Sequence, residues 1–376
     1  MELGLESVLM IIGFSLAAYS IVANDAIQTL GTFLASNAHR PWWVLWLFTM
    51  AILSVVLVYG WYAHLGDVSY GRLEKFPPPA QFSWVYLLPP VFVLALTRFG
   101  IPVSTTFLVL TVFVTTNLEK MLTKSLMGYL VAIVVGYLVY WLVAAKAEKY
   151  FIRTADEERP KAYWTVLQWV STGFLWSQWL MHDLANIFIY APSSGINADG
   201  IRTISQTWLW GALFWFFILH AVIFYQRGGG IQKIVTSKTN TQDIRSATIV
   251  DFIYAIILLV FKEMSNIPMS TTWVFLGLLA GREFAIATIT HMRDHKDVLK
   301  IVGSDMGKAA IGLSVSVALA FSAPTIKHMI SGDVKEIATI EETSGAEIEN
   351  STQTKLETQE QALFQLASRT NMENKR

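Results

Sequence analysis

The same short polar motif occurs twice in this chain, each time between two apolar stretches. The first copy reads Ile101-Pro102-Val103-Ser104-Thr105-Thr106 and the second reads Ile267-Pro268-Met269-Ser270-Thr271-Thr272. Proline lacks an N–H and disfavours helical geometry before it, so each motif predicts a break between two helices. The helix that follows would expose unpaired N–H groups and partial positive charge. Two such ends that point at each other predict a site for a small oxyanion.

A second pair of polar clusters interrupts the apolar segments upstream of the motifs. The first is Asn24-Asp25-Ala26-Ile27-Gln28, and the second is His182-Asp183-Leu184-Ala185-Asn186. An ionisable side chain inside a membrane segment is costly and is therefore a functional candidate. Carboxylate and amide oxygens suit a coupling cation, either Na⁺ or H⁺. The alternative is that these Asp residues cap a helix break or lie at the membrane interface.

Two sets of residues follow as candidate sites. We assign substrate binding to the two triplets, which are Ser104, Thr105, Thr106, Ser270, Thr271 and Thr272. We assign coupling-ion binding to the two polar clusters, namely Asn24, Asp25, Gln28, His182, Asp183 and Asn186. No other metal site is expected. Simple capping would explain either triplet alone. Their duplication at matching positions favours binding, and the two roles are compatible if the Ser residues cap and the Thr residues bind.

The composition places these motifs in a polytopic membrane protein. Hydrophobic residues make up 53% of the chain, charged residues 15%, and the mean hydropathy is +0.45. Runs such as Trp42 to Tyr62 are long enough to cross a hydrocarbon core of ~30 Å as a helix. Trp and Tyr often stand at the ends of these runs, as in the aromatic belts of membrane proteins. The net charge is zero, which gives no indication of a nucleic-acid partner. The absence of Cys excludes disulfides.

The order of these segments predicts an all-α fold of two inverted repeats. Each repeat has three crossings and a re-entrant hairpin at its Pro motif, and an odd number of crossings inverts the second repeat. The expected parts are a first repeat (1–145), a cytoplasmic connector (146–164), a second repeat (165–325) and a mobile polar tail (326–376). The expected helices cover residues 5–37, 42–62, 84–98, 102–116, 126–145, 165–190, 207–225, 248–262, 268–280 and 307–324.

The distribution of basic residues orients this topology. Fifteen Lys and Arg fall in the loops expected inside and five in those expected outside. Since cytoplasmic loops carry the excess of Lys and Arg, both termini are predicted outside. The first apolar run has no basic residue before it, so we read it as a retained helix rather than a cleaved signal peptide.

At these motifs the chain resembles the inorganic phosphate transporter family. Members typically show G-A-N-D-x-A-N-x-x-G-T in the first half, N-D-V-A-N-A-I-G-P in the second, and P-x-S-T-T-H in both. Here Gln28 replaces an Asn of the first motif and His182 replaces the first Asn of the second. Both triplets are intact, but the His that follows them is Phe107 in one copy and Trp273 in the other. The resemblance covers roughly residues 5–325 and indicates a divergent member.

The resemblance implies a cation-coupled symporter for a small inorganic anion, phosphate first, in the inner or plasma membrane. It implies no cofactor beyond the coupling ion, Na⁺ or H⁺. Sulfate or another oxyanion stays open as substrate, as does an uncoupled anion channel or sensor on the same fold. An intramembrane hydrolase that uses Ser104 or Ser270 with His182 is the enzymatic alternative. It lacks a nucleophile-elbow pattern and leaves the duplication unexplained, so we expect no enzyme. The oligomeric state is not readable from the sequence.

Overall fold

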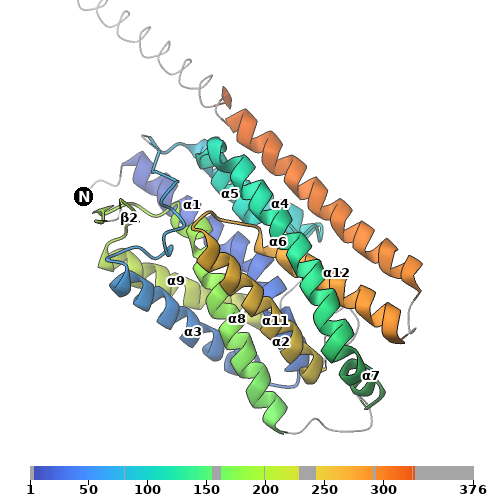
Figure 1. Ribbon diagram of the computed structural model, residues 1–376. Coiled ribbons are helices and arrows are strands. Elements are labelled where there is room, and N and C mark those ends of the chain that lie inside the picture. The colour runs from blue at the N-terminus through green and yellow to red at the C-terminus, as the bar shows by residue number, and fades with distance from the viewer. Residues whose placement is uncertain are drawn as a thin grey trace, which may run out of the picture. The chain divides into compact units, whose positions relative to one another are not determined.

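The structure is a computed structural model in which most of the chain is helical (Figure 1). It describes residues 4–79, 81–154, 162–198, 200–227, 243–290, 294–323 and 325–326. The chain divides into two compact units, Met1–Ser322 and Ala323–Arg376. All the helices discussed below belong to the first unit, apart from the last residue of its final helix. The tail expected at 326–376 falls almost wholly outside the described residues.

The helices of the first half follow the expected order. They are α1 (Leu5–Ile21), a π-helical turn (Val22–Ala26), α2 (Ile27–Ser36), α3 (Trp42–Ala63), a 3-10 turn (Trp84–Leu87), α4 (Leu88–Arg98), α5 (Thr105–Phe113), α6 (Leu118–Val139), a second π-helical turn (Tyr140–Ala144) and α7 (Ala145–Thr154). The π-helical turn contains Asn24 and Asp25. Such single-turn insertions occur frequently at functional sites, because they re-aim side chains that a regular helix would place elsewhere.

The second half repeats this order, and most of its helices are longer than their counterparts in the first half. Its elements are α8 (Ala162–Phe188), a small antiparallel pair of β1 (Gly195–Ile196) with β2 (Arg202–Thr203), α9 (Gln206–Tyr225), α11 (Ile244–Met264), α12 (Thr271–Thr290) and a last described helix, His295–Ala323. The connector expected at 146–164 thus contains most of α7 and the start of α8. The repeat boundaries themselves stay predictions.

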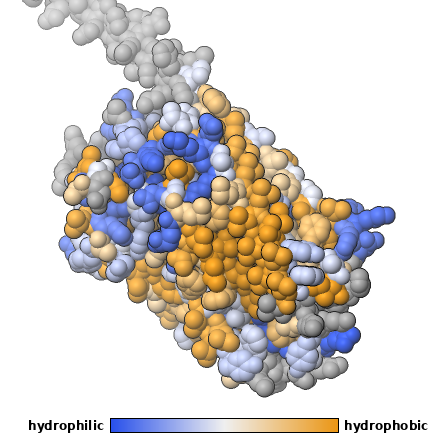
Figure 2. Space-filling model, viewed as in Figure 1, coloured by the Kyte–Doolittle hydropathy of each residue, from blue (hydrophilic) through white to orange (hydrophobic). Residues whose placement is uncertain are grey.

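The surface and the helix lengths are those of a multi-pass membrane protein. Within the described residues, seven helices are long and apolar enough to cross a membrane. Large apolar side chains point outward from them; Val55 and Phe214, for example, are 67% and 68% exposed. Hydrophobic residues cover the middle of the face shown in Figure 2, and hydrophilic residues gather toward its upper left and lower right. Lipid would cover such a band at no desolvation cost.

Both Pro motifs break the helices where the sequence predicts. In hairpin 1, α4 ends at Arg98 and α5 begins at Thr105. Gly100 makes the turn with a φ of 68°, a value that suits a residue without a Cβ. In hairpin 2, α11 ends at Met264 and α12 begins at Thr271. Residues 84–116 therefore do not form one continuous helix.

The two hairpins differ in length more than the sequence analysis expects. The helices α4 and α5 have 11 and 9 residues, whereas α11 and α12 have 21 and 20. At 1.5 Å per residue, α4 is about 16 Å long and α11 about 31 Å. Hairpin 2 therefore reaches much further, and Arg72 from the loop between α3 and α4 bonds to its turn. Hairpin 1 has the length of a re-entrant segment.

Several helix ends were placed wrongly by the search for apolar runs. The helix α6 begins at Leu118 rather than 126, and the last described helix begins at His295 rather than 307. Charged residues in the first turns of these helices hid their starts. Arg282 was counted in an inner loop, but it is buried in α12 and pairs with Glu283 at 2.8 Å. Counting the Lys and Arg residues of expected loops therefore misplaces a basic residue that forms an ion pair inside a helix.

The expected loops sort to two ends of the unit. At one end, Trp61 donates to Ile204 O at 2.9 Å and Asn117 donates to Lys75 O at 2.8 Å. At the other end, Arg227 donates to Arg40 O at 3.1 Å and Arg245 donates to Phe151 O at 3.0 Å. The first group comes from loops expected outside, and the second comes from the expected inner loops or the helix ends beside them. Which end faces the cytoplasm stays a prediction.

Glycines let α6 and α12 meet backbone to backbone. Gly277 and Gly281 are spaced four apart on α12, the pattern that allows close helix approach in membranes. A Cβ added at Gly281 would lie 2.2 Å from Ile133 O, and one at Gly277 would lie 2.5 Å from Tyr129 O. Gly136 of α6 approaches Leu278 O in the same way, at 2.8 Å. The contact therefore has no room for a side chain on either helix.

We predict that Gly281→Ala destabilises the protein. The added methyl group must push α6 and α12 apart, and overpacking of this kind costs about 1–3 kcal/mol. Gly211→Ala in α9 is the matched control, because no atom lies within 4 Å of the added Cβ there. Thermal unfolding in detergent should show a lower midpoint for Gly281→Ala and an unchanged or higher one for the control. Equal midpoints for both variants would contradict the close contact.

Candidate functional site

The breaks of both hairpins and the two polar clusters meet in one buried site. Eleven of the twelve predicted site residues are at most 5% exposed: Asn24, Asp25, Ser104, Thr105, Thr106, His182, Asp183, Asn186, Ser270, Thr271 and Thr272. The twelfth, Gln28, lies in α2, and its side chain is outside the described residues. Asp25 and Thr272 are 247 positions apart in the sequence, and the fold brings them into contact.

Asp25 accepts hydrogen bonds from both hairpins. The Thr105 hydroxyl, at the start of α5, donates to its Oδ2. The Thr272 hydroxyl, at the start of α12, lies 3.3 Å from its Oδ1. Asn24 donates to the same Oδ1 at 2.7 Å and to Val103 O at 2.9 Å. One carboxylate thus joins the π-helical turn to the first turns of both hairpin helices.

Asp183 occupies the corresponding place in the second half. The Thr106 hydroxyl lies 3.3 Å from its Oδ1, and Asn186 donates to that same oxygen at 2.8 Å. The Asn186 amide is also within 3.2 Å of the Thr105 hydroxyl and 3.1 Å of the Thr106 hydroxyl. It therefore connects the two carboxylate groups through the first triplet.

The contacts of Thr106 and Thr272 are exchanged between the halves. Thr106 of the first half lies 3.3 Å from Asp183 and 3.2 Å from Met269 O, both in the second half. Thr272 of the second half lies 3.3 Å from Asp25 and 3.2 Å from Val103 O, both in the first. Such matched contacts are what an internal twofold axis would produce. The inverted relation of the halves as a whole stays a prediction.

The serines of the triplets cap their helices, as the sequence analysis expects. Ser104 Oγ accepts from Phe107 N at 3.3 Å, and Ser270 Oγ accepts from Trp273 N at 3.2 Å. Phe107 and Trp273 replace the family's His, and their rings pack together at 5.6 Å between centroids. The positions that follow the two triplets thus contact each other and form an apolar wall rather than a pair of proton carriers.

His182 is turned away from the carboxylates. Its Nε2 bonds to Leu258 O of α11 at 2.8 Å, and because a carbonyl only accepts, this nitrogen carries the hydrogen. Nδ1 is buried and has no partner among the described residues. The His182 side chain therefore links α8 to α11 and offers no oxygen to the site.

Most of the polar atoms that face one another in the cluster are oxygens. Carboxylates, hydroxyls, Asn amides and the carbonyls of Val103 and Met269 face one another in a volume shielded from water. Among the described residues, Asp183 Oδ2 and Asn186 Oδ1 are buried without a hydrogen-bond partner. Buried polar atoms usually have partners, so these two acceptors are exceptions within the cluster, and cation binding by these residues stays a prediction.

Comparison with known proteins bears on the fold. No protein-family model matches the chain, and no curated protein sequence does. One solved structure, "The sodium-dependent phosphate transporter", is similar with a TM-score of 0.51 and 17% sequence identity. The match covers 86% of this chain and 98% of that one.

The fold of this chain is similar to that of this solved structure. At 17% identity the likeness establishes the architecture alone. Substrate and coupling ion have to be argued from the residues of this chain.

A further buried carboxylate, Asp251, is not among the predicted site residues. Asp251 of α11 accepts from Thr32 at 2.5 Å and from Thr172 at 2.6 Å, and it is 1% exposed. It stands in the apolar segment expected at 248–262, so the rule that flags ionisable residues within spans would have found it. The predicted sites rest on the two duplicated motifs, and Asp251 belongs to neither of them. It joins α2, α8 and α11 toward the end that carries Arg40.

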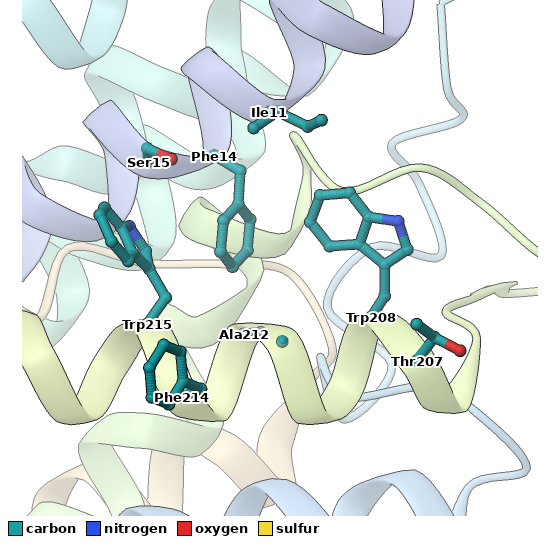
Figure 3. A pocket seen from close by; sticks show the side chains of 9 residues that line it. Ile11, Phe14, Ser15, Thr207, Trp208, Ala212, Phe214 and Trp215 are labelled. Atoms are coloured by element: carbon teal, nitrogen blue, oxygen red, sulfur yellow. The ribbon is translucent and has the colours of Figure 1, made fainter. Parts of the chain in front are cut away.

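Two of the hollows outside the buried cluster differ in their lining. One, of about 430 Å³, is a groove between α1 and α9 that Phe14, Trp208, Phe214 and other apolar side chains line (Figure 3). Its walls offer hydrocarbon rather than charge, so it is no site for an inorganic ion. The other, of about 760 Å³, is polar and lies at the end that carries His64 and Asn197. We call this second hollow the vestibule.

We predict that Asp251 and Thr172 are energetically coupled. Thr172→Val leaves one carboxylate oxygen without its donor, and an unsatisfied buried charge-assisted bond costs about 1–3 kcal/mol. In an Asp251→Asn background the same change should cost less, because the charge is already gone. Unfolding in detergent of the wild type, the two single variants and the double variant measures the coupling. Additive effects would mean that the bond contributes nothing to stability.

Proposed function

We propose that the protein is a cation-coupled transporter of a small inorganic oxyanion, with phosphate as the first candidate substrate. The observation that supports this most directly is the sharing of hydroxyls between carboxylates and helix N-termini. Thr105, Thr106 and Thr272 each stand in the first turn of a hairpin helix and lie against Asp25 or Asp183. The same Thr hydroxyls thus lie at the helix N-termini that are proposed to bind the anion and beside the carboxylates that are proposed to bind the cation.

A hydroxyl has one hydrogen, and this limits what each Thr can do. While Thr105 donates to Asp25, it has no hydrogen left for an anion at the start of α5. A cation bound to Asp25 would neutralise the carboxylate and would be coordinated by a lone pair of the Thr105 hydroxyl oxygen. The hydrogen would then turn toward the anion. Cation and anion binding would thus favour each other, and the coupling must be equal in both directions.

The Ser caps take up the N–H groups of Phe107 and Trp273, and the N–H groups of the Thr residues before them would supply the remaining donors. Both α5 and α12 begin at their triplet, where N–H groups have no partner within the helix and carry partial positive charge. An oxyanion with several acceptor oxygens suits two such ends at once. Alternating access would follow from movement of one repeat-derived bundle against the other. Both termini would lie outside.

Uptake into proteoliposomes tests the whole proposal. Labelled phosphate and sulfate are offered to vesicles with a Na⁺ gradient, a proton gradient or neither. We expect concentrative uptake of one anion under one gradient. Flux that merely equilibrates the anion under every condition would indicate an uncoupled channel on the same fold. Sulfate uptake without phosphate uptake would keep the mechanism and change the substrate.

We predict that Asp25→Asn and Asp183→Asn each abolish coupled uptake while the protein remains folded. The amide keeps size and most hydrogen bonding but lacks the charge that a cation needs. Asp297→Asn, at an exposed position in the last described helix, is the control and should transport normally. Gradient-driven uptake, together with elution as a single species from a sizing column, measures the effect. Wild-type rates in both buried variants would make these carboxylates structural.

We predict that Thr105→Val and Thr271→Val weaken substrate binding to a similar degree. Each loses a donor to a charged ligand at constant shape, which costs about 1.5–3 kcal/mol, or roughly ten- to a hundredfold in affinity. Thr111→Val is the matched control, since that buried hydroxyl on α5 bonds only to Phe107 O among the described residues, at 2.5 Å. Transport affinity is measured beside thermal stability. Lower stability with unchanged affinity would reduce both triplets to caps.

A further inference from the structure

Two buried basic side chains meet at the turn of hairpin 2. Arg72 comes from the loop between α3 and α4, and Lys124 from α6; they are 1% and 9% exposed. Arg72 Nη1 donates to Ser265 O at 3.1 Å and to Ile267 O at 3.2 Å. Lys124 Nζ donates to the same two carbonyls at 2.8 and 2.7 Å. Two cations thus share one pair of neutral acceptors.

Neither cation has a carboxylate partner among the described residues. The ion pairs found there are Arg245 with Asp243, Lys262 with Glu263 and Arg282 with Glu283. Burial lowers the pKa of Arg72 to about 10, and the negative charges of Asp183 and Glu263 oppose that shift from beyond ion-pairing distance. The guanidinium therefore keeps its charge at neutral pH.

Several donors at this point have no acceptor. Arg72 Nε and Nη2 are buried and make no hydrogen bond with any described residue. An ammonium has three N–H donors, and the carbonyls use two of those on Lys124. A buried charge without a counter-charge costs several kcal/mol, and an unsatisfied buried donor in a native structure often marks an ion or water. The group that would satisfy all of these donors is an anion with several oxygens.

The position of this pair suits a site on an access path. Gly71 and Asn266 line the vestibule. Gly71 directly precedes Arg72, and Asn266 lies between Ser265 and Ile267, whose carbonyls the two basic side chains share. Lys262 lines it too, paired with Glu263 at 3.0 Å, and Asp67 and Glu74 are also part of the lining, so the two basic groups at the turn are the unpaired positive charges beside it among the described residues. On the other side, Ile267 lies three residues before the Ser270 cap of α12. An anion held here would stand between the vestibule and the buried cluster.

We propose that Arg72 and Lys124 form a second anion-binding site, for a small inorganic oxyanion such as phosphate or sulfate, at the turn of hairpin 2. We call it the tip site. The inference rests on the proposed function only for the class of ligand; the unpaired donors themselves argue for the site. Arg72 supplies a planar pair of donors, Nε and Nη2, that matches two oxygens of one oxyanion. Lys124 supplies the neighbouring charge.

Titration of the purified full chain in lipid-free detergent with inorganic phosphate, followed by calorimetry, tests the tip site. The wild type should bind at two classes of site. Arg72→Gln and Lys124→Gln should each weaken the tip class by about ten- to a hundredfold and leave the other class unchanged. Lys124→Arg should restore it, because charge and donors return. Arg202→Gln is the matched control: that buried Arg donates to Ile189 O and Ala191 O, without a neighbouring cation in those bonds.

The outcomes separate this inference from the proposed function. Thr271→Val should weaken the other class and spare the tip class. If Arg72→Gln and Lys124→Gln lower the unfolding midpoint but leave the phosphate isotherm as in the wild type, the pair is a structural clamp and the tip site is refuted. If phosphate binding depends on Arg72 and Lys124 but on neither triplet, the tip site stands and the proposed central site fails. Binding of phosphatidic acid in micelles, without binding of inorganic phosphate, would assign the donors to a lipid headgroup and overturn the inference.

Discussion

The burial of Asp25 and Asp183 is the constraint on which the rest of the structure depends. A carboxylate in the interior of a membrane protein is stable only if its surroundings supply hydrogen-bond donors or a compensating charge. Here the donors are hydroxyls and amides, and most come from segments far away in the sequence. The two helix breaks at the Pro motifs can be buried because these contacts satisfy their polar groups. Irregular backbone within a membrane is tolerated only where protein or a water-filled cavity surrounds it.

The long helices serve this arrangement in two ways. They carry polar residues on their inward faces, as α8 does with Gln168, Thr172, Asp183 and Asn186, which is why α8 is too polar to count among the apolar spans. They also hold the hairpins in place through small residues. Gly128 of α6 lies against Met269 and Val274 of hairpin 2, and Gly312 of the last described helix lies against Pro102 and Val103 of hairpin 1. Each hairpin turn is thus supported by a helix of the other half.

Much of the fold and of the candidate site could be predicted because it depends on local sequence patterns that occur twice. Proline next to a Ser-Thr-Thr triplet fixes a break and a cap with little help from the rest of the chain, and both appeared as expected. The length of hairpin 2 could not be predicted, since it follows from the contact of α12 with α6. The environment of Arg72 and Lys124 was missed for a related reason. A basic residue next to a loop looks solvated in the sequence, and only the folded chain shows that backbone carbonyls surround it.

The backbone contact between α6 and α12 has a mechanical consequence. Helices whose backbones touch cannot slide along each other. A shift along the helix axis would move Gly281 away from Ile133 O and bring a residue with a side chain against that carbonyl. The helices α6 and α12 therefore behave as one rigid pair. Regular helix geometry is interrupted beside this pair at residues 265–270 and in the π-helical turn Tyr140–Ala144. If the protein changes conformation as proposed, bending is expected at these two places rather than between the paired helices.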